Sequence, residues 1–159
     1  MNRFRQFYID NGNRLFAYLL RKSGSAHVAA DLVQESFTRY LERYRHREQS
    51  PALLFTIGRN LFYDSKRFDR RFVHEMEMVE RASIGQEEGY LAKEASERLF
   101  AAMEHLSDEE RDILSLVAGG GLDYREISEI HRCSVANVKV KVHRARQKLK
   151  ELLRENEHG

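Results

Sequence analysis

Apolar residues recur at steps of three and four along most of the chain, which is the pattern of amphipathic helices. The pattern predicts helices over residues 2–22, 26–45, 51–70 and 90–105, with shorter ones after residue 107. Their apolar sides are expected to contain Phe4, Tyr8, Leu15, Leu19 and Leu20; Val33, Phe37, Tyr40, Leu41 and Tyr44; Leu54, Ile57, Leu61 and Phe62; and Leu91, Ala95, Leu99 and Met103. No long stretch alternates apolar and polar residues, so a sheet has little support. The sequence therefore predicts an all-α fold.

Several helix boundaries are marked by residues that cap helix ends. The single proline, Pro51, is compatible with the first turn of a helix. The run Gly119–Gly121 is expected to stop a helix. Predicted N-terminal caps are Ser107 with Glu110 and Asp123 with Glu126, both at the capping-box spacing, and Ser134.

The segment between the third and fourth predicted helices has a different composition. It carries two glycines, only scattered apolar residues, and the acidic residues Glu75, Glu77, Glu80, Glu87 and Glu88. This composition is typical of a linker, although MEMVERA could form a short helix. We therefore expect two small helical domains, residues 1–71 and 94–159, joined by a flexible acidic linker over residues 72–93. A length of 159 residues is compatible with two such domains.

The distribution of charge is more informative than its total. A net charge of +2 would not by itself imply a nucleic-acid partner. From Ser134 to Lys150, however, there are six basic residues and no acidic one. Helical spacing places Val135, Val138, Val142, Ala145 and Leu149 on one stripe and leaves the cations on the other faces. Together with the short helical pattern Tyr124–Ile130 and a turn at Arg132 and Cys133, this predicts a helix-turn-helix with a basic recognition helix.

The outward residues of the recognition helix are candidates for DNA contacts. They are Asn137, Lys139, Val140, Lys141, His143 and Arg144. Lysine and arginine can contact guanine or phosphate, asparagine can read adenine, and Val140 can contact a thymine methyl group. Arg125, at the start of the preceding helix, suits a phosphate contact. A merely solvated basic face is the alternative, which the absence of balancing acidic residues disfavours.

The same sequence offers little to support catalysis. The seven histidines never form a metal-binding spacing such as HExxH, and Cys133 has no partner cysteine. We therefore expect no catalytic residues, no metal and no cofactor, and the chain is not expected to be an enzyme. A single cysteine excludes an internal disulfide. No apolar run approaches the ~20 residues needed to cross a bilayer, and the N-terminus lacks the apolar core of a signal peptide. We expect a cytoplasmic protein without membrane insertion.

Three stretches together resemble a known family. They are AADLVQESF at residues 29–37, FTIGRNLFYDSKR at residues 55–67, and LSDEERDILSLVAGGGLDYREISEI followed by VKVKVHRARQKL within residues 106–149. Their order and spacing resemble the sigma factors of bacterial RNA polymerase, specifically the small extracytoplasmic-function (ECF) group with two conserved domains. The resemblance implies a promoter-specificity subunit that binds core RNA polymerase and promoter DNA and starts transcription. It also implies an anti-sigma factor as a partner.

The resemblance also assigns roles to the N-terminal domain. It implies polymerase binding by the second helix, through Asp31, Leu32, Gln34, Glu35 and Phe37, although a solvated face over an ordinary core would show the same pattern. It implies −10 recognition and melting by Arg59, Asn60, Asp64 and Arg67. The loop 47–52 is expected to capture a flipped base. Phe55, Phe62 and Tyr63 are expected in the core. The C-terminal domain is expected to bind the −35 element.

Two departures from the family pattern stand out. Gly58 occupies a position where alanine is usual, at a cost of ~1 kcal/mol in helix propensity. His131 and Arg132 replace the Leu-Gly often found in the family's turn, so this turn is expected to be strained or differently packed. The alternative function is a stand-alone helix-turn-helix regulator that binds duplex operators as a dimer. An adaptor that binds protein alone fits the basic recognition helix poorly.

Overall fold

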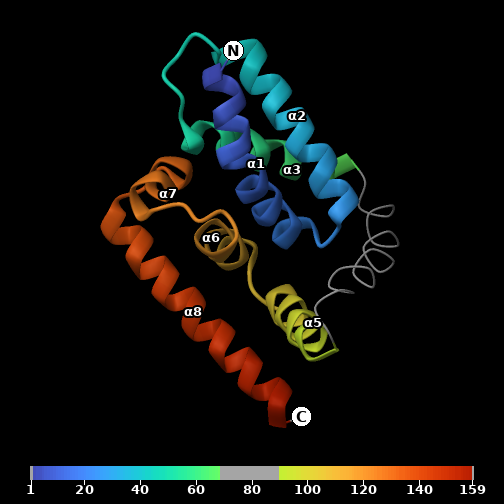
Figure 1. Cartoon of the computed structure of the whole chain (residues 1–159). Helices are drawn as coiled ribbons and strands as arrows, with labels where there is room; N and C mark the ends of the chain where they lie inside the picture. Colours follow the sequence, from blue (N-terminus) through green and yellow to red (C-terminus); the bar gives the residue numbers. More distant parts are fainter. Residues whose placement is uncertain (1, 69–89, 159) are drawn as a thin grey trace.

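The computed structural model describes residues 2–68 and 90–158, and every regular element within these ranges is a helix. The helices, labelled as in Figure 1, are α1 (Asn2–Ser23), α2 (Ala26–Tyr44), α3 (Pro51–Phe68), α5 (Tyr90–Glu104), α6 (Asp108–Ala118), α7 (Tyr124–His131) and α8 (Val135–His158). The predicted all-α fold is confirmed for these residues.

The three N-terminal helices, α1 to α3, pack against one another around an aromatic core. Phe7 stacks on Tyr40 with their ring centroids 5.1 Å apart, and Phe37 meets Phe7 edge to face. On α1 the prediction was partly wrong, because Phe7 and Tyr18 are buried whereas Tyr8 is 38% exposed. Leu15 and Leu19 are fully buried as predicted, so the apolar stripe of α1 differs from the predicted one mainly near its start, where Phe7 takes the place of Tyr8.

Three of the C-terminal helices, α6, α7 and α8, begin at the predicted caps. The Glu110 backbone N–H donates to Ser107 Oγ (3.1 Å) and completes a capping box. Asp123 and Glu126 form the second capping box, at the start of α7. The Asn137 backbone N–H donates to Ser134 Oγ (3.0 Å), so Ser134 caps α8. The glycine run follows the end of α6, as predicted.

The helix-turn-helix consists of α7 and α8, with α6 packed against both. Val138, Val142 and Ala145 on α8 are fully buried, and Leu149 is half-buried. Val135 was expected in the core but is 38% exposed, because it lies in the first turn of α8, at the end of the buried stripe. Helix α8 continues to His158, two turns past the basic segment.

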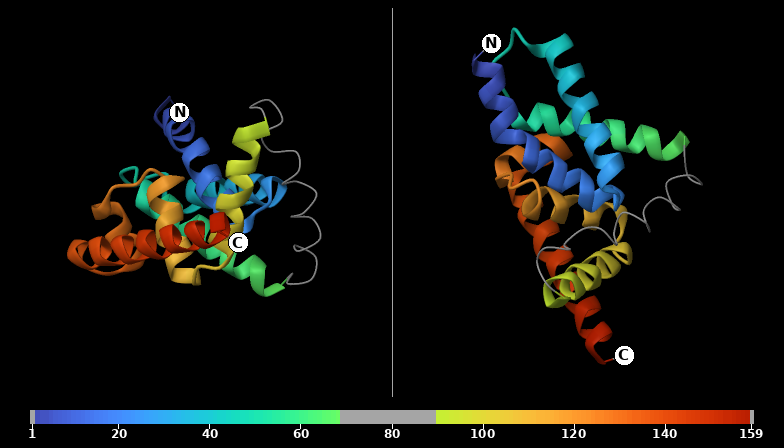
Figure 2. Two further views of the ribbon diagram at one scale, coloured as in Figure 1. Left: turned by 90° about the horizontal axis from the view of Figure 1, so that it is seen from below. Right: turned by 45° about the vertical axis from the view of Figure 1, so that its right-hand side comes forward.

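The two groups of helices also pack against each other. Figure 1 shows α6 between the N-terminal helices and α8, and the views in Figure 2 agree. Helix α1 contacts α6, and α3 contacts α7. Arg14 on α1 donates to the backbone carbonyls of Gly120 (2.8 Å) and Gly121 (3.1 Å). One hydrophobic cluster therefore continues through both groups. The linker predicted over residues 72–93 lies mostly outside the described residues.

Candidate nucleic-acid and polymerase interfaces

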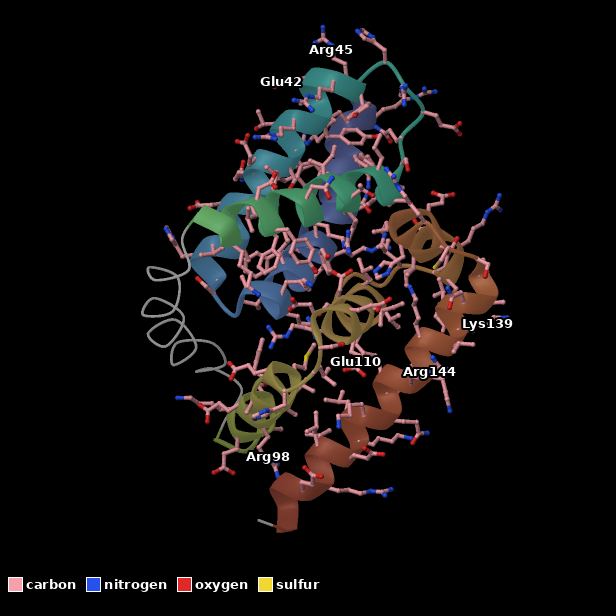
Figure 3. All side chains as sticks on the ribbon, turned by 180° about the vertical axis from the view of Figure 1, so that it is seen from behind. Glu42, Arg45, Arg98, Glu110, Lys139 and Arg144 are labelled. Carbon is pink, nitrogen blue, oxygen red and sulfur yellow. The ribbon has the colours of Figure 1, made fainter. Side chains whose placement is uncertain are left out.

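The predicted −35 residues of α8 form an outward row. Asn137, Lys139, Val140, His143 and Arg144 are all exposed, and Val140 retains 45% of its accessible surface. Figure 3 shows Lys139 and Arg144 along α8, at a distance from Arg45 near the other end of the molecule. Because Val138 and Val142 point into the core, Lys139 and Val140 between them point outward. This arrangement presents cations, an amide and one apolar side chain to a groove.

Two further predicted −35 residues differ in their surroundings. Lys141 is half-buried, and its Nζ lies 2.7 Å from Glu109 Oε1 on α6. Hydrogen bonding to Lys141, together with its positive charge, lowers the pKa of Glu109 below its usual value. Arg125 is exposed at the start of α7, on the same group of helices. A DNA contact by Lys141 would therefore require this side chain to leave Glu109 or to contact both.

On α2 the structure divides the five predicted polymerase-binding residues. Asp31, Gln34 and Glu35 are exposed, and Glu35 forms an ion pair with Arg39 (3.0 Å). The side chains of Leu32 and Phe37, in contrast, are buried in the N-terminal core. They pack beneath the exposed face of α2 and leave little surface for a partner.

An apolar groove that sequence reasoning missed lies beside this surface. It has a volume of about 410 Å³ and runs between α1 and α2. Its lining includes Tyr8, Ile9 and Phe16 from α1 and Gln34 from α2, whose amide donates to the Tyr8 hydroxyl (3.3 Å). Ile9 is 56% exposed. The signal in the sequence was an isoleucine outside the predicted apolar stripe of this helix.

The predicted −10 residues lie on α3. Asn60 and Asp64 are exposed. Arg59 is half-buried, and its guanidinium lies 5.1 Å from the centroid of the Tyr63 ring. The side chain of Arg67 lies outside the described residues. Phe55 and Phe62 are buried, which confirms their expected place in the core, whereas Tyr63 is only half-buried.

The loop between α2 and α3 borders a cavity of about 780 Å³. Tyr40, Tyr44 and Arg47 contribute to its lining, and the Arg47 guanidinium lies 5.4 Å from the centroid of the Tyr44 ring. The Ser50 backbone N–H donates to the Tyr40 hydroxyl (3.1 Å), which fixes the end of the loop. Aromatic rings and cations around a cavity of this size suit an unstacked base.

A buried carboxylate joins the two groups of helices. Asp112 on α6 has no accessible surface. Its Oδ1 accepts from the Tyr18 hydroxyl and lies 3.2 Å from Lys22 Nζ, both on α1. Its Oδ2 lies 2.9 Å from Arg59 Nε on α3 and 2.7 Å from His131 Nε2 on α7. Every lone pair of the carboxylate is thus directed at a donor, as a buried charge requires.

The protonation of this cluster follows from its burial and its charges. Burial alone would raise the pKa of Asp112, but the hydrogen bond to His131 and the charges of Lys22 and Arg59 outweigh it and hold that pKa well below its usual value. Burial, reinforced by the charge of Asp112, raises the pKa of Tyr18. Burial and the same charge raise the pKa of Tyr63 to about 12. Asp112 is therefore an anion and both tyrosines are neutral at neutral pH. The Tyr18 hydroxyl donates to Asp112, whereas the Tyr63 hydroxyl accepts from Lys22 Nζ (2.6 Å).

Nothing in the sequence pattern pointed to the Asp112 cluster. Its members come from four helices and lie up to about a hundred residues apart in the sequence. Judged by its sequence neighbours alone, each is an ordinary polar residue. The described residues contain no group of three side chains suited to hold a metal ion. Among the described helices, none is long and apolar enough to cross a membrane.

Comparison with known proteins supports the sequence-based interpretation. Residues 7–72 match the family described as Sigma-70 region 2, and residues 96–149 match Sigma-70 region 4. The ECF RNA polymerase sigma factor EcfG of Rhodopseudomonas palustris is 36% identical over 142 residues, which cover 87% of this chain and 78% of that protein. SigM of Bacillus subtilis, another ECF sigma factor, is 33% identical, with 88% of each chain covered.

Two solved structures have the same fold. The sigma factor RpoE from Bartonella quintana, in complex with the anti-sigma factor NepR, superposes with a TM-score of 0.73 at 25% identity, covering 97% of this chain and 98% of that one. CnrH in complex with the cytosolic domain of CnrY superposes with a TM-score of 0.70 at 22% identity, covering 96% and 88%. The two matched regions define a promoter-recognition subunit of bacterial RNA polymerase. Within that class, this chain belongs to the ECF sigma factors.

Proposed function

We propose that the two groups of helices divide promoter recognition between them. The N-terminal helices bind core RNA polymerase and the −10 element, and the C-terminal helices bind the −35 element as duplex. The observation that carries this assignment is the exposed row on α8, which combines Lys139, Val140 and Arg144 over a buried apolar stripe. A chain of this kind acts in the cytoplasm with the polymerase and carries out no catalysis of its own.

The −10 element requires contacts to separated bases as well as to the backbone. Asn60 and Asp64 on α3, together with Arg59 and Arg67, are the polar groups assigned to this task. The cavity beside loop 47–52 is the assigned pocket for a flipped base, because Tyr44 and Arg47 offer a ring and a guanidinium for stacking.

The polymerase is assigned to the exposed face of α2, which carries Asp31, Gln34 and Glu35. The groove with Tyr8 and Ile9 extends this surface onto α1 and adds the apolar contact that charged residues alone would lack. An anti-sigma factor is a further proposed partner, since the superposing RpoE structure is a complex with one.

The deciding experiment is transcription in vitro with core polymerase on a promoter library, with and without the chain. We expect polymerase-dependent transcripts whose start sites share −10 and −35 sequences. A stand-alone regulator would instead bind symmetric duplex sites without polymerase and would direct no new start sites.

The polymerase surface has its own test. Replacing Asp31 and Glu35 by Lys should weaken association with core polymerase at least tenfold, because like-charge juxtaposition at an interface costs several kcal/mol. The matched control is Glu42→Lys, which changes an exposed carboxylate at the far end of the same helix. Unchanged co-purification of the double variant would remove this face from the interface.

A further inference from the structure

The cavity beside the loop between α2 and α3 has a second wall, which the first turn of α1 forms. Arg3 and Phe4 line the cavity together with residues of α2 and of the loop. Figure 1 shows the start of α1 beside this loop, and the right-hand view of Figure 2 agrees. The Phe4 ring meets the Phe37 ring of α2 edge to face, with centroids 6.2 Å apart. This contact anchors the first turn of α1 to the aromatic core.

A hydrogen bond joins the two walls of the cavity. The side-chain amide of Gln49, in the loop, donates to the backbone carbonyl of Arg3 on α1 (3.0 Å). The end of the loop is held separately, by the bond from the Ser50 backbone N–H to the Tyr40 hydroxyl. The Gln49 amide therefore determines how closely the middle of the loop approaches α1.

The charge around the cavity favours an anionic occupant. The described residues that line it include three arginines, Arg3, Arg45 and Arg47, and one carboxylate, Glu48, all of them exposed. The Arg47 guanidinium lies near the Tyr44 ring on the wall that α2 and the loop form, whereas Arg3 stands on the α1 wall. Sites for single-stranded nucleic acid combine rings that stack on bases with cations that follow the backbone. A volume of about 780 Å³ leaves room for a whole nucleotide.

The family match does not account for the α1 wall. Sigma-70 region 2 matches residues 7–72, so Arg3 and Phe4 precede the matched region. The resemblance in the sequence pointed to the loop alone as the site of base capture. The hydrogen bond from Gln49 links that loop to a segment outside the match.

We propose that the first turn of α1 completes the base pocket. Arg3 contacts a backbone phosphate next to the captured nucleotide, and Gln49 is a positioning residue that holds the loop against this turn. The inference rests on the proposed function, because it takes the −10 strand as the occupant of the cavity. An arginine is suited to this contact because its planar fork of N–H groups matches the oxygens of a phosphate. A loop that is already fixed loses less freedom when the base enters.

The test uses the full chain assembled with core polymerase. The probe is promoter DNA with a single-stranded −10 element, taken from a promoter selected in the transcription experiment. Replacing each −10 nucleotide in turn by an abasic one identifies the base that the wild type captures. Arg3→Gln removes the charge, and Gln49→Met removes the donor at a similar side-chain length. The matched control is Arg5→Gln, an exposed cation of α1 that is not among the described residues lining the cavity.

The phosphate contact predicts a change in salt dependence as well as in affinity. Arg3→Gln should weaken binding about fivefold, the upper range for an exposed ion pair, and lower the salt slope by about 0.7. Arg5→Gln should change binding less than twofold. Neutral methylphosphonates then replace the −10 phosphates one at a time, and at one position wild type and Arg3→Gln should bind equally. A gap between them that persists at every position would overturn the phosphate contact, and so would wild-type binding by Arg3→Gln.

The positioning role predicts a loss that depends on the base. Gln49→Met should weaken binding of intact DNA about threefold to tenfold, the usual range for one hydrogen bond. On DNA that is abasic at the captured position, Gln49→Met should bind like the wild type. Equal loss on both DNAs would overturn the positioning role. If no abasic position weakens the wild type, the assigned base pocket itself is wrong. If one does but both variants bind normally, only the role of α1 is overturned.

Discussion

Gly58 lies where the helices α1, α2 and α3 pack closely against one another. A Cβ added there would lie 3.1 Å from Leu15 Cδ1 on α1 and 3.1 Å from Ser36 Oγ on α2. Glycine therefore lets α3 approach both helices closely, which offsets its unfavourable helix propensity. Gly12 on α1 differs, because a Cβ there would meet only Tyr8 Cε1, at 3.9 Å.

These two glycines should respond oppositely to substitution. Gly12→Ala should raise the free energy of unfolding by about 0.5–1 kcal/mol, because it removes backbone entropy without a clash. Gly58→Val should lower it by about 1–3 kcal/mol, because the larger side chain overpacks the crossing. Urea unfolding followed by circular dichroism measures both. A Gly58→Val variant as stable as the wild type would show that Leu15 and Ser36 can move aside.

The contrast between Ser107 and Asp112 shows what the sequence could and could not predict. Ser107 was found because its cap depends only on Glu110, three residues away. The same local logic found the α8 row, since helical spacing decides which residues face outward. Asp112 depends on Lys22, Arg59 and His131, whose proximity arises only from the packing of distant helices. For the same reason the sequence did not show that Leu32 is buried, whereas helical spacing had already placed Phe37 on the apolar side of its helix.

The turn of the helix-turn-helix is strained at one residue. Arg132, which ends α7, is the one non-glycine residue with positive φ among the described residues (φ 53°, ψ 49°). Its backbone N–H donates to the Ser128 carbonyl, as in a left-handed helix cap. Left-handed backbone costs a residue with a side chain about 1–2 kcal/mol. The expectation of a strained turn, drawn from the absence of glycine, is therefore confirmed.

Relieving this strain should stabilise the turn. Arg132→Gly should raise the free energy of unfolding by about 0.5–1 kcal/mol. Glycine removes the strain of the left-handed backbone, but its greater freedom in the unfolded chain cancels part of that gain. Arg132→Ala is the control, because it removes the same guanidinium but keeps the strained backbone. Equal stability of the two variants in thermal unfolding would mean that the side chain, not the backbone, determines the effect.

Two exposed cations of the recognition helix should affect DNA binding in different ways. Arg144 lies on the half of α8 expected in the groove, whereas Lys150 lies almost two turns further on; both are exposed. Arg144→Ala should cost about 1–3 kcal/mol and relax the preference at one −35 position. Lys150→Ala should weaken all sequences alike and reduce the salt slope by about one unit. Binding across a randomised −35 library distinguishes them, and an unchanged preference for Arg144→Ala would exclude it from base reading.

At the scale of the whole molecule, the surfaces proposed for partners differ in how accessible they are. The exposed face of α2 and the outer face of α8 are accessible in the compact chain, whereas the Arg59 face of α3 is not fully accessible. A partner can therefore reach the exposed face of α2 in the compact chain.

Protonation of Asp112 in acid should weaken the interface between the two groups of helices. The pKa of Asp112 is lowered in the folded chain, so its contribution to stability is fully present above the usual carboxyl pKa of about 3.9 and is lost as the pH falls through the lowered folded-state value. Asp112→Asn should cost about 3–5 kcal/mol at pH 7, the usual cost of breaking a buried ion pair. The gap between wild type and variant should stay constant from pH 7 to about pH 5 and narrow below pH 4.

Other carboxylates also titrate in this range, so the measured quantity is the difference in unfolding free energy between wild type and Asp112→Asn at each pH. Subtraction removes the groups that titrate alike in both chains. Glu129→Gln, an exposed carboxylate on α7, is the control and should show no gap larger than about 0.5 kcal/mol at any pH. A gap for Asp112→Asn that stays the same at pH 3 and pH 7 would mean that the cost comes from packing of the amide. The charge of the carboxylate would then play no part in holding the two groups of helices together.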